Sequence, residues 1–360
     1  MIVPTLTFVA AVNPVKYMHA EPVFMDCDDS LCIDPVKLRR FCEEECYLEQ
    51  VQEKWRLVHK ASGKCVKALI VVHVFGNLAD MEAIMEIAEQ YHLKVIEDAT
   101  EALGTYYMQG RYAGKFAGTI GDFGSYSFNG NKIITGSSGG MLLTDDEEAA
   151  NKVRKWSTQA RENAPWYQHE EIGYNYRMSN VIAGVVRGQM PYLEEHIAQK
   201  KAIYERYKEG FKNLPVKMNP FDEKNSVPNY WLSCMTINPE AMCKQVRGEA
   251  EVLYISEKSK SCPTEILDAI ADLNAEGRPI WKPMHMQPIY RMNAFVTREG
   301  DGRAKTNAYI SGGTLGKDGN PLDVGMDIFH RGLCLPSDNK MTPEQQDVII
   351  EAVKRCFDGE

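Results

Sequence analysis

The pattern that most constrains the fold is a pair of apolar, β-rich runs with one amphipathic helix between them. Residues 68–74 (ALIVVHV) form a continuous apolar run, as expected for a strand covered on both faces of its sheet. Asp80 can cap the helix that follows, which carries apolar residues on one face, namely Ile84, Ile87, Ala88 and Tyr91. Residues 93–96 form the next strand. This order predicts a β-α-β unit and therefore a parallel sheet.

Further strands are expected on both sides of this unit. The opening residues (MIVPTLTFVAAVNPV) predict a buried strand that runs into a loop, and residues 23–25 predict a short strand. Residues 123–128 and 140–144 predict two more strands, joined by the glycine-rich segment GNKIITGSSGG. A chain of 360 residues, 44% of them hydrophobic, can bury such an α/β core and a second, smaller domain.

The second half of the chain begins with a long helical pattern over residues 192–214. Its apolar stripe consists of Leu193, Ile197, Tyr204, Tyr207, Phe211 and Leu214. Because such a helix commonly joins a large domain to a smaller one, we expect one domain over residues 1–200 and another over 201–360.

Two features are expected near the C-terminus. Residues 291–325 are polar and glycine-rich, which predicts a long surface loop. Thr342 and Gln345 form a capping box for a final helix. The residues of that helix expected to face inward are Val348, Ala352, Val353 and Cys356.

The charge of the chain argues against a nucleic-acid-binding protein. Lys and Arg number 41 against 50 Asp and Glu, a net charge of -9, whereas binding to phosphate backbones needs concentrated basic residues. No apolar run reaches the roughly 18 residues of a membrane span, so no membrane partner is expected. Ten cysteines without a secretion signal indicate a reducing cytoplasm rather than a disulfide framework.

Four cysteines lie close together in the sequence and raise the question of a zinc site. Cys27, Cys32, Cys42 and Cys46 lack the two-residue spacing of a zinc knuckle, and the nearby His19 precedes them all. We therefore expect buried or half-buried free thiols and no metal.

An acid and a lysine are expected to meet at one edge of the sheet. Asp98 follows the strand at residues 93–96, and Lys132 lies in the glycine-rich segment, so both belong to the carboxyl ends of strands, where ligands of open α/β sheets bind. Lys132 could attack an aldehyde, and Asp98 could keep a pyridine nitrogen protonated. Ser127 could offer its hydroxyl to a phosphate. A solvated lysine and a turn-forming aspartate remain the alternatives.

Three long strings carry a resemblance to a known family. VIEDATEALGTYY, GDFGSYSFNGNKIITGSSGGMLLT and EIGYNYRMSN resemble the nucleotide-sugar aminotransferases of the DegT/StrS type. The resemblance extends from Pro4 to Pro336, and RPIWKPMHMQPIY and RGLCLPS match the C-terminal part of the family. It implies an aspartate-aminotransferase-like fold: a large three-layer domain with a mostly parallel sheet, plus a smaller C-terminal α/β domain.

The resemblance also implies roles for residues around the cofactor, pyridoxal 5'-phosphate. Lys132 should bind the cofactor covalently, Asp98 should pair with its pyridine nitrogen, and Ser127 should hold its phosphate. Phe8, in PTLTF, matches the aromatic residue that stacks on the ring, although an ordinary core phenylalanine is an alternative. Glu101 stands where relatives often carry Gln or His near the phenolic oxygen, and is a departure from that pattern.

Two further positions concern the partner subunit and the substrate. Asn175, in GYNYRM, matches a residue that reaches the phosphate of the neighbouring subunit, which implies a homodimer with shared active sites. The alternative for Asn175 is an asparagine at a helix start. His285 lies in a motif that lines the substrate side in relatives.

The start of the sequence departs from the family pattern. By the resemblance, members usually carry a further stretch before PTLTF, which holds the first strand of the sheet and a loop whose backbone amides bind phosphate. We therefore expect the sheet to lack that strand beside residues 140–144, and the chain to hold pyridoxal phosphate poorly or not at all. A truncation and a naturally short form both remain open.

The function implied is transamination of a 4-keto sugar linked to UDP, dTDP or GDP, with glutamate as amino donor. Such a reaction would serve the biosynthesis of a polysaccharide or glycan. The alternative is a non-catalytic homologue or partner subunit that lost cofactor binding together with its N-terminal segment.

Overall fold

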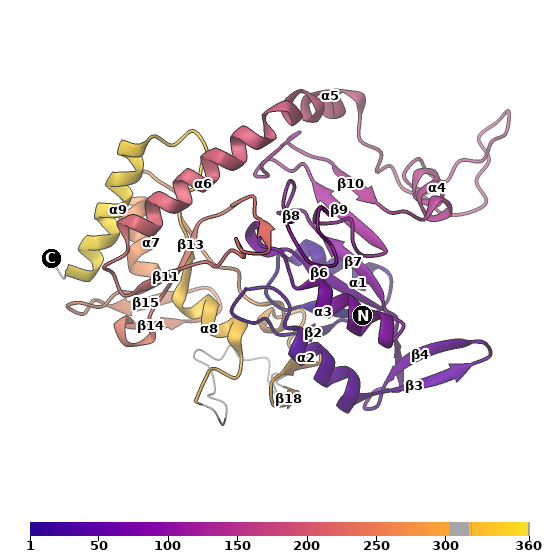
Figure 1. Cartoon of the computed structure of the whole chain (residues 1–360), viewed down its shortest axis with the longest axis horizontal. Helices are drawn as coiled ribbons and strands as arrows, with labels where there is room; N and C mark the ends of the chain where they lie inside the picture. Colours follow the sequence, from indigo (N-terminus) through magenta and orange to yellow (C-terminus); the bar gives the residue numbers. More distant parts are fainter. Residues whose placement is uncertain (302–316, 318, 359–360) are drawn as a thin grey trace.

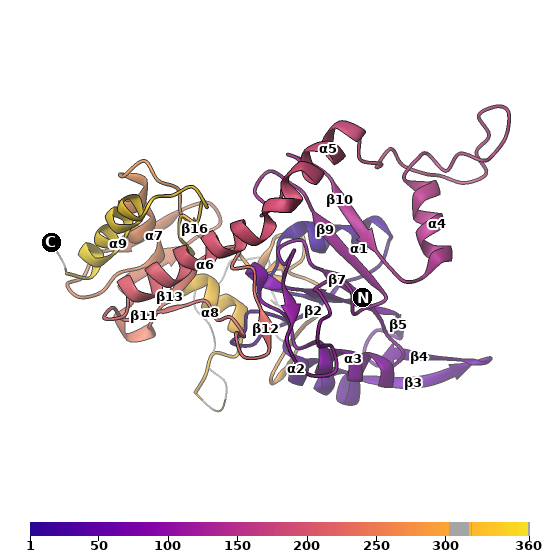
Figure 2. The ribbon, with the colours of Figure 1, turned by 45° about the horizontal axis from the view of Figure 1, so that its top comes forward.

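A computed structural model describes residues 1–301, 317 and 319–358. Its centre is a sheet to which the described residues contribute eight strands (Figures 1 and 2). In spatial order these are β10 (Gly140–Leu143), β9 (Phe123–Ser127), β7 (Lys94–Asp98), β6 (Ala68–Val72), β1 (Ile2–Pro4), β2 (Val23–Met25), β17 (Phe295–Thr297) and β18 (Gly300–Asp301). The pairings from β9 to β17 are parallel, and those of β10 and β18 are antiparallel. The predicted α/β fold with a mostly parallel sheet is confirmed.

The central strands are the most apolar part of the chain. Every residue of β1 and β6 is buried, and Leu69 of β6 pairs with Ile2 on one side and Val95 on the other. Strands buried on both faces need continuous rather than alternating apolar residues. The continuous apolar run at residues 68–74 therefore correctly predicted a strand that is covered on both faces of the sheet.

Helices lie on both sides of this sheet. Here α2 (Pro35–Arg40) and α3 (Met81–Gln90) contact each other on one side, and α5 (Asn180–Gln189) lies across the sheet near β10 (Figures 1 and 2). The cap of α3 is as predicted, because Ala83 N donates to Asp80 Oδ1 at 3.1 Å. Two more helices of this half of the chain are α1 (Asn13–Tyr17) and α4 (Glu147–Trp156). Within the described residues, every helix is too short or too polar to span a bilayer.

Helix α6 (Leu193–Gly210) leads from α5 to a second hydrophobic core (Figure 1). That core surrounds an antiparallel sheet of β11 (Val216–Met218), β13 (Cys234–Ile237), β19 (Gly332–Cys334) and β16 (Arg278–Pro279), together with α7 (Pro263–Ala271) and α9 (Pro343–Asp358). The predicted stripe of α6 places Tyr204, Tyr207 and Phe211 among the buried residues. The division into 1–200 and 201–360 stays a prediction.

Smaller elements complete the described fold. An antiparallel ribbon of β3 (Cys46–Val51), β4 (Lys54–His59) and β5 (Lys64–Val66) projects from the body (Figure 1). Two short pairs follow, β8 (Tyr106–Tyr107) with β12 (Ser226–Val227) and β14 (Lys244–Arg247) with β15 (Val252–Ile255). The last helix before β19 is α8 (Val324–Arg331).

The structure corrects two sequence-based expectations. Within the expected loop 291–325, Phe295–Thr297 forms β17, because Phe295 and Val296 are buried where they pair with β2. Gly300–Asp301 forms β18 beside it, and α8 begins at Val324. Residues 302–316 and 318 of that stretch lie outside the described residues. In α9 the predicted capping box is present, with Thr342 N donating to Gln345 Oε1 at 3.0 Å. Of the residues predicted to face inward, Val353 is buried and Cys356 is partly buried against the second core, but Val348 is 52% exposed. The buried residues of α9 are Gln346, Ile349, Ile350, Val353 and Phe357.

The ten cysteines are free thiols, as expected. Cys27, Cys32, Cys42 and Cys46 are all buried. Burial raises the pKa of Cys32 to about 12 and that of Cys46 to about 12, so these thiols stay protonated. Among the described residues, no cluster of three or more His, Cys, Asp or Glu could hold a metal ion.

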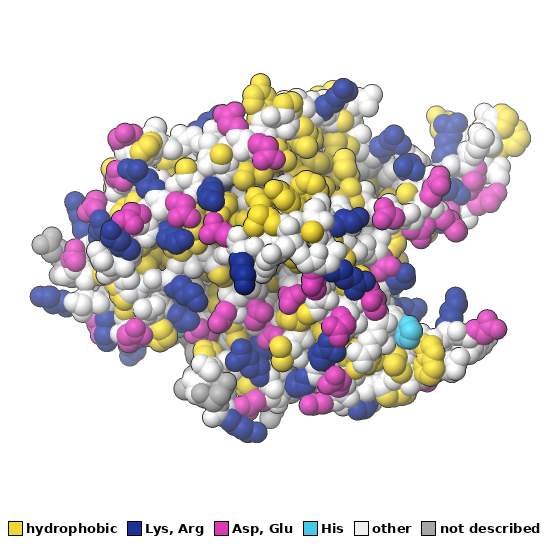
Figure 3. Space-filling view, in the orientation of Figure 1, with side chains coloured by type: hydrophobic (Ala, Val, Ile, Leu, Met, Phe, Trp, Pro, Cys, Tyr) yellow, Lys and Arg dark blue, Asp and Glu magenta, His cyan; other side chains and the backbone are white. Residues whose placement is uncertain are grey.

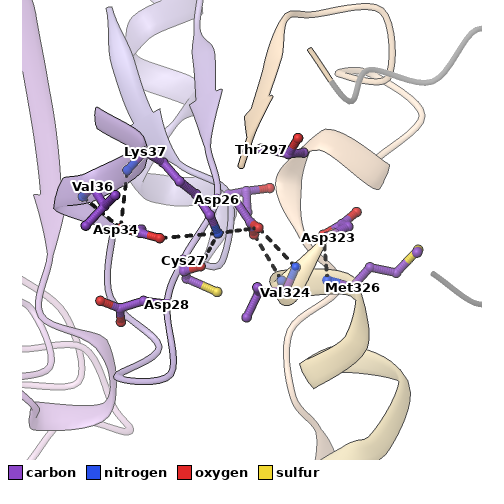
Figure 4. Close-up of polar contacts among 12 residues, drawn as sticks. Asp26, Cys27, Asp28, Asp34, Val36, Lys37, Thr297, Asp323, Val324 and Met326 are labelled. Atoms are coloured by element: carbon purple, nitrogen blue, oxygen red, sulfur yellow. Dashed lines mark hydrogen bonds and ion pairs between the residues drawn. The ribbon is translucent and has the colours of Figure 1, made fainter. Parts of the chain in front are cut away.

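A buried ion pair ties the sheet to the C-terminal half (Figure 4). Asp26, directly after β2, accepts hydrogen bonds from Lys37 Nζ at 2.7 Å and from the backbone N–H groups of Val324 and Gly325 at 3.0 Å. Lys37 Nζ also donates to Cys27 O at 2.6 Å. Both charged side chains are at most 1% exposed. Asp26 therefore anchors the start of α8, which comes from the far end of the sequence.

Replacing Lys37 by methionine is expected to lower the free energy of unfolding by roughly 3–5 kcal/mol, because a buried carboxylate is left without its cation. Urea unfolding followed by circular dichroism would measure the loss. In the double variant Lys37→Met, Asp26→Asn, the loss should be smaller than the sum of the two single losses. Strict additivity would show that the two charges do not stabilise each other.

Candidate active site

A cavity of about 1240 Å³ opens at the carboxyl ends of the parallel strands. Its lining includes five of the residues singled out from the sequence, namely Phe8, Asp98, Glu101, Ser127 and Lys132. Sites for single small ligands occupy roughly 300–1,000 Å³. The cavity is therefore large enough for a cofactor and a second ligand together.

Asp98 and Ser127 owe their places to neighbouring strands. Asp98 is the last residue of β7, where it pairs with Ser125 of β9, and Ser127 ends β9 two residues later. Asp98 Oδ1 accepts a hydrogen bond from Thr100 N at 3.1 Å, which fixes the carboxylate at the strand end. Ser127 Oγ accepts from Asn129 N at 3.2 Å, so its own hydrogen stays available to a ligand oxygen.

Lys132 follows in the loop after β9, and its side chain is 12% exposed. Its Nζ lies 3.7 Å from Glu101 Oε1 and 4.2 Å from the centre of the Trp231 ring. The indole N–H of Trp231 donates to Asn131 O at 3.0 Å, so this tryptophan also holds the lysine-bearing loop. A cation over an indole face is stabilised electrostatically. The sequence did not reveal Trp231, because the contact comes from the other half of the chain.

Glu101 is a buried acid beside this lysine. Its Oε2 accepts a hydrogen bond from Phe75 N at 2.8 Å. Burial, with a smaller contribution from nearby Asp98, raises the pKa of Glu101 to about 7 against the opposing effect of Lys132. Near neutral pH this carboxyl can therefore take up or release a proton next to the Lys132 amine.

Replacing Glu101 by glutamine is expected to flatten the pH dependence of folding stability between about pH 4.5 and 7. The folded chain holds the Glu101 proton more tightly than the unfolded chain, because its pKa is raised from 4.5 to about 7. The raised pKa therefore contributes on the order of 3 kcal/mol to the free energy of unfolding below pH 4.5. This contribution is lost as the pH rises through 7. Urea unfolding at a series of pH values would measure the slope.

The exposed Glu148, in the first turn of α4, offers the matched control. Glu148→Gln should keep the slope of the unchanged protein. If Glu101→Gln kept it too, Glu101 would not be the group that titrates.

Two other residues predicted to belong to the site, Phe8 and His285, differ in their exposure and in whether they line the cavity. Phe8 lines the cavity and is 58% exposed, which fits a ring available for stacking and not a core phenylalanine. His285 is buried outside the described cavity lining, with Nε2 2.7 Å from Asp323 Oδ2 and Nδ1 2.5 Å from Thr5 Oγ1. Its predicted contact with substrate stays a prediction.

Asn175 lies outside the cavity of its own chain. It is exposed and forms an isolated β-bridge with Thr158, in the segment between α4 and α5. It is not at a helix start, since the next helix begins at Asn180. Its predicted role in a neighbouring subunit therefore stays a prediction.

The donor set fits pyridoxal phosphate. Lys132 offers an amine for the aldehyde, Asp98 offers a carboxylate for the pyridine nitrogen, and Ser127 offers a hydroxyl for the phosphate. Phe8 offers an exposed ring as a stacking surface. These four groups face one cavity, as the chemistry requires.

Comparisons with known proteins agree with this chemistry. The sequence model of the DegT/DnrJ/EryC1/StrS aminotransferase family matches residues 1–307. The chain is 37% identical over 355 residues to EpsN of Bacillus subtilis (strain 168), a provisionally assigned pyridoxal phosphate-dependent aminotransferase, covering 98% of this chain and 76% of EpsN. It is 33% identical over 358 residues to GDP-perosamine synthase of Escherichia coli O157:H7, covering 99% and 79% of the two chains.

Solved structures show the same fold. PseC of Helicobacter pylori, an aminotransferase involved in the biosynthesis of pseudoaminic acid, has a TM-score of 0.74 at 17% identity, covering all of this chain and 80% of PseC. A DegT DnrJ EryC1 StrS aminotransferase from Brucella abortus also has a TM-score of 0.74, at 22% identity, covering 99% and 79% of the two chains. At these identities the likeness establishes the fold.

Proposed function

This chain belongs to the DegT/DnrJ/EryC1/StrS aminotransferase family, whose members depend on pyridoxal phosphate, and we propose that it aminates the 4-keto carbon of a nucleotide-linked sugar with glutamate as donor. The observation that carries the proposal is the cavity in which Lys132, Asp98 and Ser127 meet. The relatives named GDP-perosamine synthase support a sugar-nucleotide substrate. The product would serve the biosynthesis of a polysaccharide or glycan.

Each residue of the cavity has a separate task in this reaction. Pyridoxal phosphate, when bound, supplies an electron-withdrawing ring that allows an amino group to pass between two substrates. Lys132 would hold the cofactor covalently through its Nζ, with the aldehyde oxygen leaving as water, and its Nζ would carry a proton once the amine of a substrate has displaced it. Asp98 would keep the pyridine nitrogen protonated by placing a negative charge beside it. Ser127 would donate its hydroxyl hydrogen to the phosphate, and Phe8 would offer its ring for stacking.

Glu101 acts on Lys132 in this scheme. With a pKa of about 7 and a distance of 3.7 Å to the lysine Nζ, it can hold the proton that Lys132 must lose before its amine attacks an aldehyde. The carboxyl is fixed by Phe75 N. It therefore stays beside Lys132 in either protonation state.

We also propose a homodimer with shared active sites, in which Asn175 reaches the cofactor phosphate of the partner subunit. Exposed apolar side chains on β10 and α5 support it: Met141, Leu142, Val181 and Val185 are between 41% and 76% exposed. Hydrophobic side chains gather on the face beside α5 (Figure 3). Such a surface is typical of a protein–protein contact.

We further propose that the chain is located in a reducing cytoplasm, which would keep the ten thiols free.

The test is amino transfer itself. The protein, saturated with pyridoxal phosphate, is incubated with glutamate and a 4-keto sugar linked to UDP, dTDP or GDP, and the amino sugar is detected by mass spectrometry. Product that requires both glutamate and cofactor is expected with one of the three nucleotides. A protein that binds the cofactor on Lys132 yet aminates none of them would instead be the non-catalytic homologue.

A further inference from the structure

One face of α6 lines the same cavity as Lys132. His196 and Lys200, four residues apart, lie on the same face of this helix, and both line the cavity. The Nδ1–H of His196 donates to Ile133 O at 3.0 Å, so His196 lies directly beside the lysine-bearing loop. Lys200 stands one helical turn farther along, about 6 Å at 1.5 Å per residue. Its Nζ contacts Ser337, and residues 335–340 also line the cavity, so Lys200 belongs to the side of the cavity that the C-terminal part of the chain forms.

Lys200 is a half-buried cation without a carboxylate partner among the described residues. Its Nζ donates a hydrogen bond to Ser337 O, which leaves two of its three hydrogens for another acceptor. Burial lowers the pKa of Lys200 to about 8, and the charge of Asp338 opposes this only in part. A buried charge of this kind is costly unless it meets an opposite charge.

The neighbouring charges do not neutralise this end of the cavity. Lys340 is exposed, lines the same cavity, and forms no ion pair within the described part of the chain. Arg278, at the rim, is already paired with Glu276 at 2.5 Å. Asp338 is exposed and accepts a hydrogen bond from the backbone of Lys340 at 2.8 Å. Because Arg278 and Glu276 offset each other, Lys200 and Lys340 stand against the one carboxylate of Asp338, and this group of residues carries a net positive charge.

We propose that Lys200, with Lys340 at the rim, binds an anionic group of the second ligand, beyond the cofactor. The proposal rests on the proposed function, because two substrates of such a reaction bring anions into this cavity. One is the carboxylate of the amino donor, and the other is the diphosphate of the sugar-nucleotide. A charge-assisted hydrogen bond from Lys200 serves either group, and the experiment distinguishes them.

Isothermal titration calorimetry with two probes, inorganic pyrophosphate and L-glutamate, tests the site. Lys200→Gln removes the charge but keeps an amide N–H for the Ser337 carbonyl. It should lower the affinity of the protein for one of the two probes by about tenfold or more. The probe whose affinity falls identifies the anion that Lys200 binds. Lys200→Arg keeps the charge and should stay within about threefold of the unchanged protein.

Lys201 is the matched control, one position along the same helix. It is 53% exposed and paired with Glu223 at 3.4 Å, so Lys201→Gln should bind both probes like the unchanged protein. If Lys200→Gln does not fold, Lys340→Gln still tests the site, because Lys340 is exposed. This variant should lower the affinity for the same probe by about threefold. The proposal is overturned if the unchanged protein binds neither probe, or if neither lysine variant differs from it.

These titrations need no turnover. If amino transfer fails while Lys200 still governs anion binding, the proposed function is wrong and the anion site stands. If amino transfer succeeds while Lys200→Gln binds both probes normally, only the anion site is wrong.

Discussion

Replacing Lys132 by alanine is expected to abolish covalent binding of pyridoxal phosphate and all amino transfer, while the fold stays intact. The amine is the nucleophile that the aldehyde of the cofactor requires, and among the described residues Lys132 is the lysine beside Glu101 and Trp231. The variant should unfold near the midpoint of the unchanged protein, because Glu101 can take up a proton once its cation is gone. Visible absorbance and borohydride trapping, followed by peptide mass spectrometry, would measure the covalent bond.

Lys115 provides the control for this experiment. It is exposed in the segment between β8 and β9, so Lys115→Ala should keep both the absorbance and the trapped adduct on Lys132. A trapped lysine adduct that persisted at the same cavity in Lys132→Ala would reject the assignment.

The sequence predicted those parts of the site that depend on local order. Asp98 and Ser127 end neighbouring parallel strands, and the sequence predicted the ends of these strands within two residues, at residues 96 and 128. Since parallel strands bring their carboxyl ends to one edge, two residues far apart in sequence could be placed together without a structure. The same argument placed Lys132 within a few residues of that edge.

The parts that were missed depend on contacts between distant segments. Trp231 reaches Lys132 from a position 100 residues beyond the Asn131 carbonyl that it binds, and nothing in its local sequence signals that contact. Strand β17 has three residues, too few for a pattern, and is a strand because β2 offers it an edge. In α9, Val348 is exposed because the helix turns Ile349 and Ile350 toward the second core, and apolarity alone could not choose between them.

Replacing Asp98 by asparagine is expected to slow amino transfer by about a thousandfold or more, equivalent to roughly 4 kcal/mol of activation free energy. The fold should not change, because the asparagine oxygen can still accept the hydrogen bond that Thr100 N now donates at 3.1 Å. In the role that we propose for Asp98, the variant loses the negative charge that would keep the pyridine nitrogen protonated, and without that charge the ring would withdraw electrons less strongly.

Two measurements separate this effect from a loss of binding. Titration with pyridoxal phosphate, followed by visible absorbance, should give an affinity for Asp98→Asn within about tenfold of the unchanged protein, because Lys132, Ser127 and Phe8 remain. Steady-state kinetics should place the loss in kcat. Asp145→Asn, at an exposed position after β10, should leave both quantities unchanged. Near-normal turnover in Asp98→Asn would mean that another group holds the ring nitrogen, since a neutral amide cannot replace a carboxylate in that task.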